Sequence, residues 1–379
     1  MSNIRIPLAR PAFDEREVEA VRRVLASGWV VQGPEVEAFE NEIARMHKAR
    51  HCIVVSSGTA ALHICYLALG IGPGDAVFIP SFAWPSAANM AMMVGARPVF
   101  VDVLADTYNI DPEDLRLRIE QCIKEQWGTP RAVVPVHEFG LAADMNAILR
   151  IAKEFNIQVI EDAACALGAT YKGRPVGTLG RIAILSFHPR KAVTTGEGGA
   201  VLTDDDELAE RCRMWRNHGQ VFKDGRRDFY VAGFNYRMTE IQAAVGRVQL
   251  EKFPEILKRR REIASHYLNE LNECPGISLP VNEPEHTWQT FMVVLNKEKD
   301  RNFIIDKLAE NGVGAGAGSV AGHCLYVYRE CFGYESKNLP ISARLNLQGL
   351  ALPLYSDMSD SEVYVCITEL IGRLQVYSL

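Results

Sequence analysis

Residues 184–204, "ILSFHPRKAVTTGEGGAVLTD", decide how the rest of the chain is interpreted. The stretch leads from an apolar strand to a single lysine, Lys191, then through a polar, glycine-rich turn into a second apolar strand. One interpretation is a β-hairpin with a solvated lysine at its bend. The other is a lysine placed to attack a carbonyl group, which requires desolvation or a neighbouring positive charge such as Arg190. The stretch alone favours the solvated hairpin, so other segments have to decide.

Composition and charge restrict the class of the protein. The chain has 379 residues, of which 48% are hydrophobic and 23% charged, as expected for a globular protein of about two domains. The net charge of −6 argues against a general nucleic-acid surface, which needs a basic excess. The longest apolar windows, 59–71 and 86–101, are interrupted by His63, Asn89 and Arg97. We therefore expect neither nucleic-acid binding nor a membrane span.

Nine cysteines are scattered along the chain, without a C-x-x-C pair. Several lie inside apolar stretches such as "HCIVVSSG" and "ALHICYLAL". This pattern favours reduced thiols in the core of a cytoplasmic protein over a disulfide framework or a zinc site. The sequence thus predicts a cytoplasmic location and no bound metal.

Short apolar runs alternate with helical patterns over the first two hundred residues. The runs lack polar alternation, which is typical of strands buried on both faces of a mainly parallel sheet. Such alternation predicts an α/β/α sandwich whose ligands bind at the carboxyl ends of the strands. The predicted strands are 51–58, 75–81, 97–103, 131–140, 157–165 and the two that flank Lys191. The predicted helices of this region are 14–26, 33–49, 59–70, 84–95, 111–123 and 145–156.

The pattern changes after about residue 250. A long helix is predicted over 254–272, followed by an apolar run at 288–295, a helix, a glycine-rich loop at 312–322 and a final helix. We interpret residues 1–250 as a large domain with an N-terminal arm, and residues 251–379 as a smaller C-terminal α/β domain. The glycines of 312–322 suit a close backbone approach or a flexible loop, and do not match the dinucleotide fingerprint.

Two of the predicted strand ends carry groups that could bind an anion or a cation. Gly58 and Thr59 stand between a strand and a helix, where backbone N–H groups form an anion site, although an ordinary helix cap fits equally well. Glu161 and Asp162 end another strand, and their side chains must point to opposite faces. One of them can therefore face a ligand as a base, a metal ligand or a partner of a cationic ring nitrogen, while an ion pair or a helix cap is as good an explanation.

A third strand end, "SFAW", supplies aromatic rings at residues 81–84. Trp84 there could stack on a planar ligand, although core packing is the commoner role of such a ring. An anion site, an aromatic platform, an edge carboxylate and a lysine in a loop are together the groups that hold pyridoxal 5'-phosphate (PLP). All four lie at strand ends of one predicted sheet, and this joint occurrence favours a PLP site.

Longer motifs support this interpretation. They are "SGWVVQGPEVEAFE", "SSGTAALH", "PSFAWPSAANM", "GARPVFVDV", "IEDAACALGATYKG", "SFHPRKAVTTGEGG" and "GFNYRMTEIQAA". With these motifs the chain resembles, over essentially its whole length, the DegT/DnrJ/EryC1/StrS family of PLP-dependent sugar aminotransferases. The resemblance implies fold type I, with a large α/β/α domain followed by a smaller domain.

The resemblance also implies roles for individual residues. Lys191 would bind PLP covalently and move the proton between donor and cofactor, Asp162 would pair with the pyridine nitrogen, and Trp84 would stack on the ring. The phosphate would be held by Gly58, Thr59 and Ser186.

Other implied roles involve a second subunit or the substrate. Asn235 would reach the phosphate of the neighbouring subunit, so that a homodimer is needed for a complete site. Trp29 and Arg237 would lie near the substrate. His323 is a candidate for contacting the sugar, with a core or surface histidine as the alternative.

Two positions depart from the family pattern. Cys165 stands where many relatives have Gln or His, which affects the contact to the ring hydroxyl. Glu138 stands where an apolar residue is common, and the sequence offers no physical explanation for it.

The function implied is transfer of an amino group from an amino acid, L-glutamate, to a keto-sugar, most specifically a nucleotide-linked keto-deoxyhexose. Related dehydratases resemble this pattern with His in place of the lysine, so the presence of Lys191 argues against dehydration. A non-catalytic regulatory relative is the third hypothesis, and the acidic net charge disfavours a DNA-binding form of it.

Overall fold

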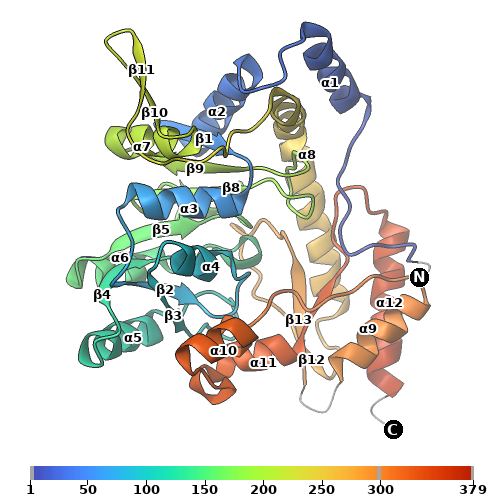
Figure 1. Cartoon of the computed structure of the whole chain (residues 1–379). Coiled ribbons are helices and arrows are strands. Elements are labelled where there is room, and N and C mark those ends of the chain that lie inside the picture. The colour runs from blue at the N-terminus through green and yellow to red at the C-terminus, as the bar shows by residue number, and fades with distance from the viewer. Residues whose placement is uncertain (1–3, 297–299, 377–379) are drawn as a thin grey trace.

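The computed structural model describes residues 4–296 and 300–376. Its main sheet has seven strands in the order β1-β9-β8-β5-β4-β2-β3 (Figure 1). Neighbouring strands run parallel except at β9, which is antiparallel to both β1 and β8. The predicted mainly parallel α/β sheet is therefore confirmed. The strands are β1 (His51–Val55), β2 (Asp75–Pro80), β3 (Arg97–Val101), β4 (Thr129–Val133), β5 (Gln158–Asp162), β8 (Ile182–Ser186) and β9 (Gly199–Thr203).

Helices cover both faces of this sheet. Successive residues of a strand point to opposite faces, so one strand contributes side chains to two core clusters. In β1, Ile53 and Val55 pack in one core cluster with helices α3, α4 and α7. Cys52 and Val54 of the same strand pack in another cluster with α2. Helices α5 and α6 form a third cluster with β2, β3, β4 and β5. The helices are α1 (Glu15–Ser27), α2 (Pro34–His47), α3 (Gly58–Ala68), α4 (Ser86–Met93), α5 (Pro112–Lys124), α6 (Met145–Glu154) and α7 (Asp206–Arg216).

A second, antiparallel sheet lies in the C-terminal part. Its order is β12-β13-β14, and helices α8, α9 and α12 pack around it (Figure 1). The core of this part contains Tyr267, Phe291, Leu308, Leu352 and Leu370. The elements are α8 (Glu240–Glu270), β12 (Ile277–Ser278), β13 (Phe291–Leu295), α9 (Arg301–Glu310), α10 (Tyr326–Phe332), α11 (Pro340–Gln348), β14 (Gly349–Leu352) and α12 (Asp360–Val376).

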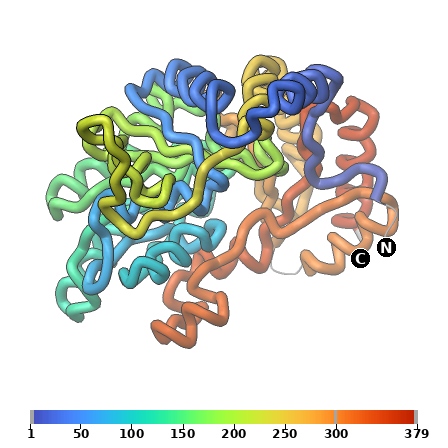
Figure 2. The backbone as a smooth tube through the Cα atoms, turned by 45° about the horizontal axis from the view of Figure 1, so that its top comes forward, coloured from blue at the N-terminus to red at the C-terminus, as the bar shows by residue number. Residues whose placement is uncertain are grey.

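The structure differs from the sequence prediction where these two parts join. Helix α8 begins at Glu240 instead of residue 254 and runs through residue 250, so the predicted boundary lies inside it. The prediction began the helix late because Pro254, which disfavours a helix interior, stands in its middle. The N-terminal arm, predicted as part of the large domain, pairs instead with the C-terminal part: Ile6 forms a bridge with Val313 (Figure 2). The division into two domains stays a prediction.

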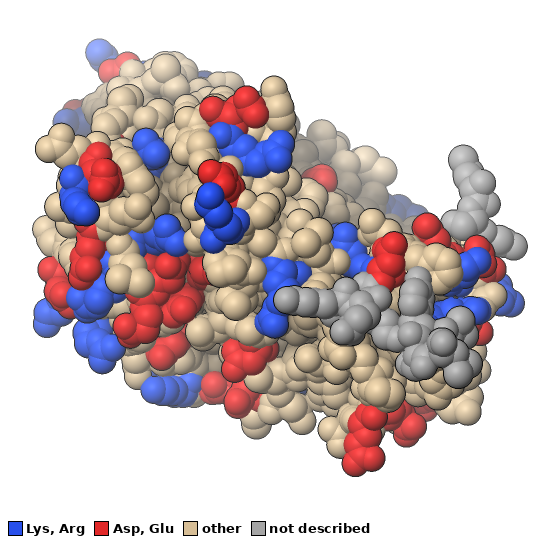
Figure 3. Space-filling model, turned by 90° about the horizontal axis from the view of Figure 1, so that it is seen from below, with Lys and Arg blue, Asp and Glu red and all other residues tan. Residues whose placement is uncertain are grey.

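Two small antiparallel ribbons complete the chain, β6 (Thr170–Tyr171) with β7 (Arg174–Pro175) and β10 (Gln220–Lys223) with β11 (Arg226–Phe229). The second ribbon projects from the body of the molecule (Figure 1). On the face seen from below, basic and acidic side chains are intermixed (Figure 3). Over the described residues, none of the helices has the length and apolar character needed to cross a membrane.

Candidate active site

One cavity of about 330 Å³ lies at the carboxyl ends of β1, β5 and β8, where a sheet of this type places its ligands. Residues from the C-terminal part close it from the other side. Seven residues singled out from the sequence line it together: Gly58, Thr59, Trp84, Asp162, Cys165, Ser186 and Lys191.

Lys191 reaches this cavity from the loop between β8 and β9. These strands pair antiparallel, so the stretch is a β-hairpin, as one of the two interpretations predicted. The loop is closed by a bond from the Phe187 N–H to the Gly198 carbonyl and by one from the Thr195 N–H to the Phe187 carbonyl. The Lys191 side chain lines the cavity, and its Nζ lies 3.0 Å from Sγ of Cys165. The lysine is therefore directed inward and is not at a solvated bend.

Asp162 and Glu161 face opposite sides of β5, as the strand alternation predicts. Glu161 is fully buried behind the sheet, where its carboxylate accepts hydrogen bonds from His137 and from the amides of Gly177, Leu179 and Gly180. Asp162 lines the cavity and accepts one hydrogen bond, from the Ala164 amide at 3.0 Å. Burial raises the pKa of Asp162 above its ordinary value. A buried carboxylate in this state is suited to a cationic partner.

The start of α3 has backbone N–H groups that can bind an anion. Ser57 caps the helix by accepting a hydrogen bond from the Ala60 amide at 3.0 Å, which leaves the amides of Gly58 and Thr59 without an intrahelical partner. Ser186 lies directly opposite, since a Cβ added to Gly58 would come within 3.1 Å of the Ser186 Cβ. The Thr59 hydroxyl donates to Oγ of Ser86 at 3.3 Å. Hydroxyls and free amides thus converge on one corner of the cavity.

The two aromatic residues of "SFAW" have different surroundings. Phe82 is fully buried and contacts Tyr108 and Phe139 edge-on. Trp84 is 70% exposed at the edge of the cavity. An indole left this exposed beside a cavity can contact a planar ligand.

These residues fit PLP on three independent observations. The free amides of α3 and the hydroxyls beside them would take the phosphate, the buried Asp162 carboxylate would take the protonated ring nitrogen, and Lys191 would bind the aldehyde carbon. Among the described residues, no group of three or more His, Cys, Asp or Glu is arranged to hold a metal ion.

Sequence reasoning missed the cavity residues that come from distant segments. Ser86 starts α4, and Gln289, Thr290, Gly318 and Ser319 come from the C-terminal part. Gln289 fixes the lysine loop by donating from Nε2 to the Arg190 carbonyl at 3.1 Å. Of these residues, Gly318 lies in the glycine-rich segment that the sequence analysis noted. The φ of Gly318 is +76°, and a Cβ at this position would lie 2.5 Å from Sδ of Met292. Of the two interpretations of that segment, the close backbone approach is the one the structure contains.

Four other predicted residues lie outside this cavity of the chain. Asn235 and Trp29 are exposed. Arg237 donates to Oδ1 of Asn217 at 2.6 Å and lines a separate hollow with residues of the β10–β11 ribbon. His323 is fully buried, with Nδ1 2.6 Å from Oγ of Ser81. In this chain His323 is a core histidine, the alternative interpretation from the sequence.

Comparison with known proteins identifies the same family. A model of the DegT/DnrJ/EryC1/StrS aminotransferase family matches residues 11–370. The solved structure of the aminotransferase TlmJ from Streptoalloteichus hindustanus is 32% identical, with a TM-score of 0.89 and coverage of 99% of this chain and 100% of that one. DesV from S. venezuelae, solved in complex with a ketimine intermediate, is 33% identical, with a TM-score of 0.86 and coverage of 97% and 99%. Spr1654 from Streptococcus pneumoniae, solved in its PLP form, is 28% identical, with a TM-score of 0.90 and coverage of 98% and 99%.

The sheet, the cavity at its carboxyl edge and the match over most of the sequence agree with one another. The chain belongs to the DegT/DnrJ/EryC1/StrS aminotransferase family, the PLP-dependent sugar aminotransferases of fold type I.

Proposed function

We propose that this enzyme transfers the amino group of L-glutamate to the keto carbon of a sugar, most specifically a nucleotide-linked keto-deoxyhexose. The observation that carries the proposal is the placement of Lys191, Asp162 and the free amides of α3 around one cavity. These groups match the three reactive or charged ends of PLP, and they occur at the strand ends of a single sheet.

Each residue has a defined task in this reaction. PLP, when bound, supplies an electron sink for the carbanion that forms beside the transferred nitrogen. Lys191 would take the proton from the α-carbon of the donor and deliver it to the carbon on the other side of the transferred nitrogen. The Asp162 carboxylate stabilises a positive ring nitrogen, which requires that it stay ionised next to that charge. In the second half of the reaction Lys191 would move a proton in the reverse direction, so that the keto carbon of the sugar ends with the amino group.

The cavity entrance is suited to anionic substrates. Arg190 lies on its rim and is exposed, and no carboxylate among the described residues forms an ion pair with it. Its guanidinium can therefore bind a substrate carboxylate or a diphosphate oxygen. Both the glutamate donor and a nucleotide-linked acceptor carry such groups.

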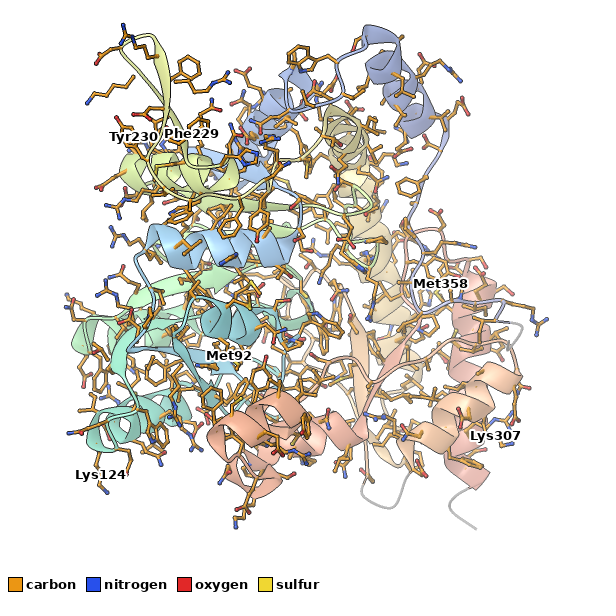
Figure 4. All side chains as sticks on the ribbon, viewed as in Figure 1. Met92, Lys124, Phe229, Tyr230, Lys307 and Met358 are labelled. Carbon is orange, nitrogen blue, oxygen red and sulfur yellow. The ribbon has the colours of Figure 1, made fainter. Side chains whose placement is uncertain are left out.

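A second copy of the chain would complete the site. The surface at Val31 and Phe229, which line one hollow, is exposed, and so are the adjoining residues Trp29 and Tyr230. Figure 4 labels Phe229 and Tyr230, at the end of the β10–β11 ribbon. Asn235 follows this ribbon and is exposed in the single chain. In the proposed homodimer this surface is covered by the partner, and Asn235 contacts the phosphate in the other subunit's cavity.

Subunit mixing tests this arrangement. Lys191→Ala and Asn235→Ala chains are each expected to be inactive, but co-expression restores activity at about a quarter of the sites, because half of the dimers are mixed and each has one intact site. If Asn235 acted within its own chain, no mixed dimer would contain an intact site and activity would not return. A monomer at micromolar concentration in a scattering measurement would also contradict the dimer.

The cysteines support the predicted cytoplasmic location. All nine are free, and Cys52, Cys65, Cys122, Cys212 and Cys366 are buried. Such use of cysteine is typical of a reducing compartment.

A substrate screen tests the reaction itself. Purified enzyme is incubated with PLP, glutamate and a panel of nucleotide-linked keto-hexoses, and the products are followed by mass spectrometry, with Lys191→Ala as the control. We expect conversion of a keto group to an amine together with formation of 2-oxoglutarate. Loss of a hydroxyl from the sugar without glutamate would identify a dehydratase and contradict the proposal.

A further inference from the structure

Glu138 is an almost completely buried carboxyl group that lines the cavity and has no role in the proposed reaction. The other two carboxylates of the cavity are Asp162, which has a role, and Glu197, which is exposed. Glu138 itself is 4% exposed. No described residue forms a hydrogen bond or an ion pair with its carboxyl group; only its backbone is bound, as the Glu138 N–H donates to Oδ1 of Asn109 at 2.9 Å. Burial of an unpartnered carboxyl group is unfavourable, so its retention in a rigid position suggests a ligand.

The backbone around Glu138 holds the side chain in place. The turn Glu138–Gly140 contains Phe139 at φ 54° and Gly140 at φ +102°, both in the left-handed region. Two backbone hydrogen bonds anchor this turn to the C-terminal part. The Gln289 backbone N–H donates to the Phe139 carbonyl, and the Thr287 backbone N–H donates to the Gly140 carbonyl. A strained turn fixed from several sides directs one side chain into a site.

Burial in the cavity favours the neutral form of Glu138. Burial raises the pKa of Glu138 to about 8; the Lys191 ammonium opposes this shift and Asp162 adds to it. At neutral pH the carboxyl group is therefore mainly protonated and can donate a hydrogen bond. The other titratable or charged groups that line the cavity are Cys165 at the end of β5, and His188, Arg190 and Glu197 in the lysine loop.

The strand order places Glu138 on a particular side of the cofactor. Along the sheet edge, the phosphate corner after β1 is followed by Ser186 of β8, then Asp162 of β5, then Glu138 after β4. On the PLP ring the hydroxyl and the phosphate arm lie on opposite sides of the line from the ring nitrogen to the aldehyde carbon. With the nitrogen at Asp162, the aldehyde carbon at Lys191 and the phosphate at α3, the hydroxyl side faces the β4 side of the cavity.

Cys165 lies on the same side but is a poor partner for a ring oxygen. Its Sγ is 3.0 Å from Nζ of Lys191, and burial raises the pKa of this thiol, so that it stays neutral. A neutral thiol is only a weak hydrogen-bond donor. A protonated carboxyl group is a much stronger one.

We propose that Glu138 is a positioning residue for PLP: its protonated carboxyl group donates a hydrogen bond to the ring hydroxyl oxygen, beside the bond that joins Lys191 to the cofactor. This donation disperses the negative charge of the oxygen. The proton on the lysine–cofactor linkage is then held less tightly, because the oxygen charge is what retains it. The inference rests on PLP binding at Lys191.

The test is a pH titration of the visible absorbance of the linkage in purified holoenzyme, with no substrate present. Glu138→Leu removes the donor, and we expect the midpoint pH of the absorbance change to rise by about one unit. Glu138→Gln keeps a neutral donor of the same size, and its midpoint should stay near that of the wild type. Glu197→Gln, which removes an exposed carboxylate from the rim, is the matched control and should leave the midpoint almost unchanged.

Several results would overturn the inference. Unchanged midpoints in both Glu138 variants would mean that Glu138 does not reach the ring oxygen. A lower midpoint in both variants would mean that Glu138 acts as a carboxylate facing the positive linkage. A shift in Glu197→Gln as large as in Glu138→Leu would indicate general charge and not donation.

Two further comparisons keep the outcome decisive. If Glu138→Leu does not fold, the wild type and Glu138→Gln are compared: ionisation of Glu138 should broaden the wild-type titration, and the glutamine variant should titrate in one sharp step. Equal widths would contradict the inference. If PLP forms no linkage to Lys191 in the wild type, the proposed function fails as well, whereas a normal linkage that is insensitive to Glu138 overturns this inference alone.

Discussion

The two sides of β5 hold neighbouring carboxylates that have opposite surroundings. Behind the sheet, Glu161 has four hydrogen-bond donors and no exposed surface. On the cavity side, Asp162 has a single hydrogen bond and Glu138 has none to its carboxyl group from the described residues. The carboxylate behind the sheet is satisfied by the chain itself, whereas the carboxyl groups on the cavity side keep oxygen atoms that a ligand can contact. Burial of a carboxyl group is thus common to both sides of β5, and the two sides differ in how many partners the chain provides for it.

The pKa directions express the same contrast. Burial acts to raise the pKa of Glu161, but the bonds from His137 and the glycine amides outweigh it, and the net pKa is lowered. Burial raises the pKa of Asp162, because its few partners do not compensate. The two carboxylates should therefore contribute to stability with opposite signs.

The largest expected effect comes from replacing Lys191, whose side chain lies in the cavity. Lys191→Ala should lower turnover by at least about 10³-fold, since both covalent binding of the cofactor and proton transfer are lost. The variant should fold normally, because the only side-chain hydrogen bond that Lys191 makes with the described residues is to Cys165. Steady-state kinetics with glutamate, together with a thermal melt, measures both quantities. Turnover within tenfold of the wild type would contradict the assignment of Lys191.

The adjacent carboxylates provide the next test. Asp162→Asn should lower turnover by about 10²-fold or more without loss of stability, because a charge aimed at the cofactor is removed. Glu161→Gln should have the reverse effect: the free energy of unfolding falls by about 1–3 kcal/mol, since an amide group then faces N–H donors behind the sheet. Chemical denaturation and kinetics of both variants check the pair. Similar effects of the two substitutions would remove the distinction between the two sides.

The pH dependence of the PLP-free protein gives a smaller effect. The raised pKa of Asp162 means that the folded protein binds its proton more tightly, so stability falls as pH rises from the ordinary aspartate range through the folded pKa. Above that window Asp162→Asn should be more stable than the wild type, by about 1.4 kcal/mol for each unit of pKa shift. The lowered pKa of Glu161 gives stability that is present above the ordinary glutamate range and is lost as pH falls through its folded pKa. The measurement is the melting temperature of the wild type and of Asp162→Asn from pH 3 to pH 8. The melting temperature of the variant should rise relative to that of the wild type as pH increases, and a constant difference between the two would contradict this contrast.

The start of α3 offers the smallest test. Ser57→Ala removes the cap of the helix and should lower the free energy of unfolding by about 1 kcal/mol. Thr59→Ala leaves the cap in place and should instead weaken PLP binding, with little change in stability. Equilibrium unfolding and PLP titration of the two variants separate the structural residue from the ligand-binding one; the reverse pattern would show that the two roles were exchanged.

Part of this site could be predicted from the sequence because it is local. Asp162 ends a strand, and Thr59 and Lys191 follow a strand end by a few residues. The carboxyl ends of parallel strands meet at one edge of a sheet. The opposite directions of the Glu161 and Asp162 side chains could be predicted from strand alternation alone. These features need only knowledge of the order of strands and helices.

The remainder depended on tertiary packing. Gln289 and Ser319 line the cavity from segments 98 and 128 residues beyond Lys191, and no local sequence pattern predicts that they lie there. The burial of Glu138 depends on the left-handed backbone conformation of Phe139, and the sequence around Phe139 does not predict that conformation. Pro254 made α8 appear shorter than it is, because packing against both parts of the molecule overcomes its local cost. Asn235 is exposed in the single chain, and the role proposed for it requires a second subunit.

The central claim is that Lys191 is the residue that binds PLP in the cavity at the edge of the main sheet. The most direct measurement is to load the purified protein with PLP, reduce it with borohydride, digest it and locate the pyridoxyl group by mass spectrometry. We expect the label on Lys191, and its loss when glutamate is added before reduction. A label on another lysine, or no label on the wild-type chain, would contradict the account.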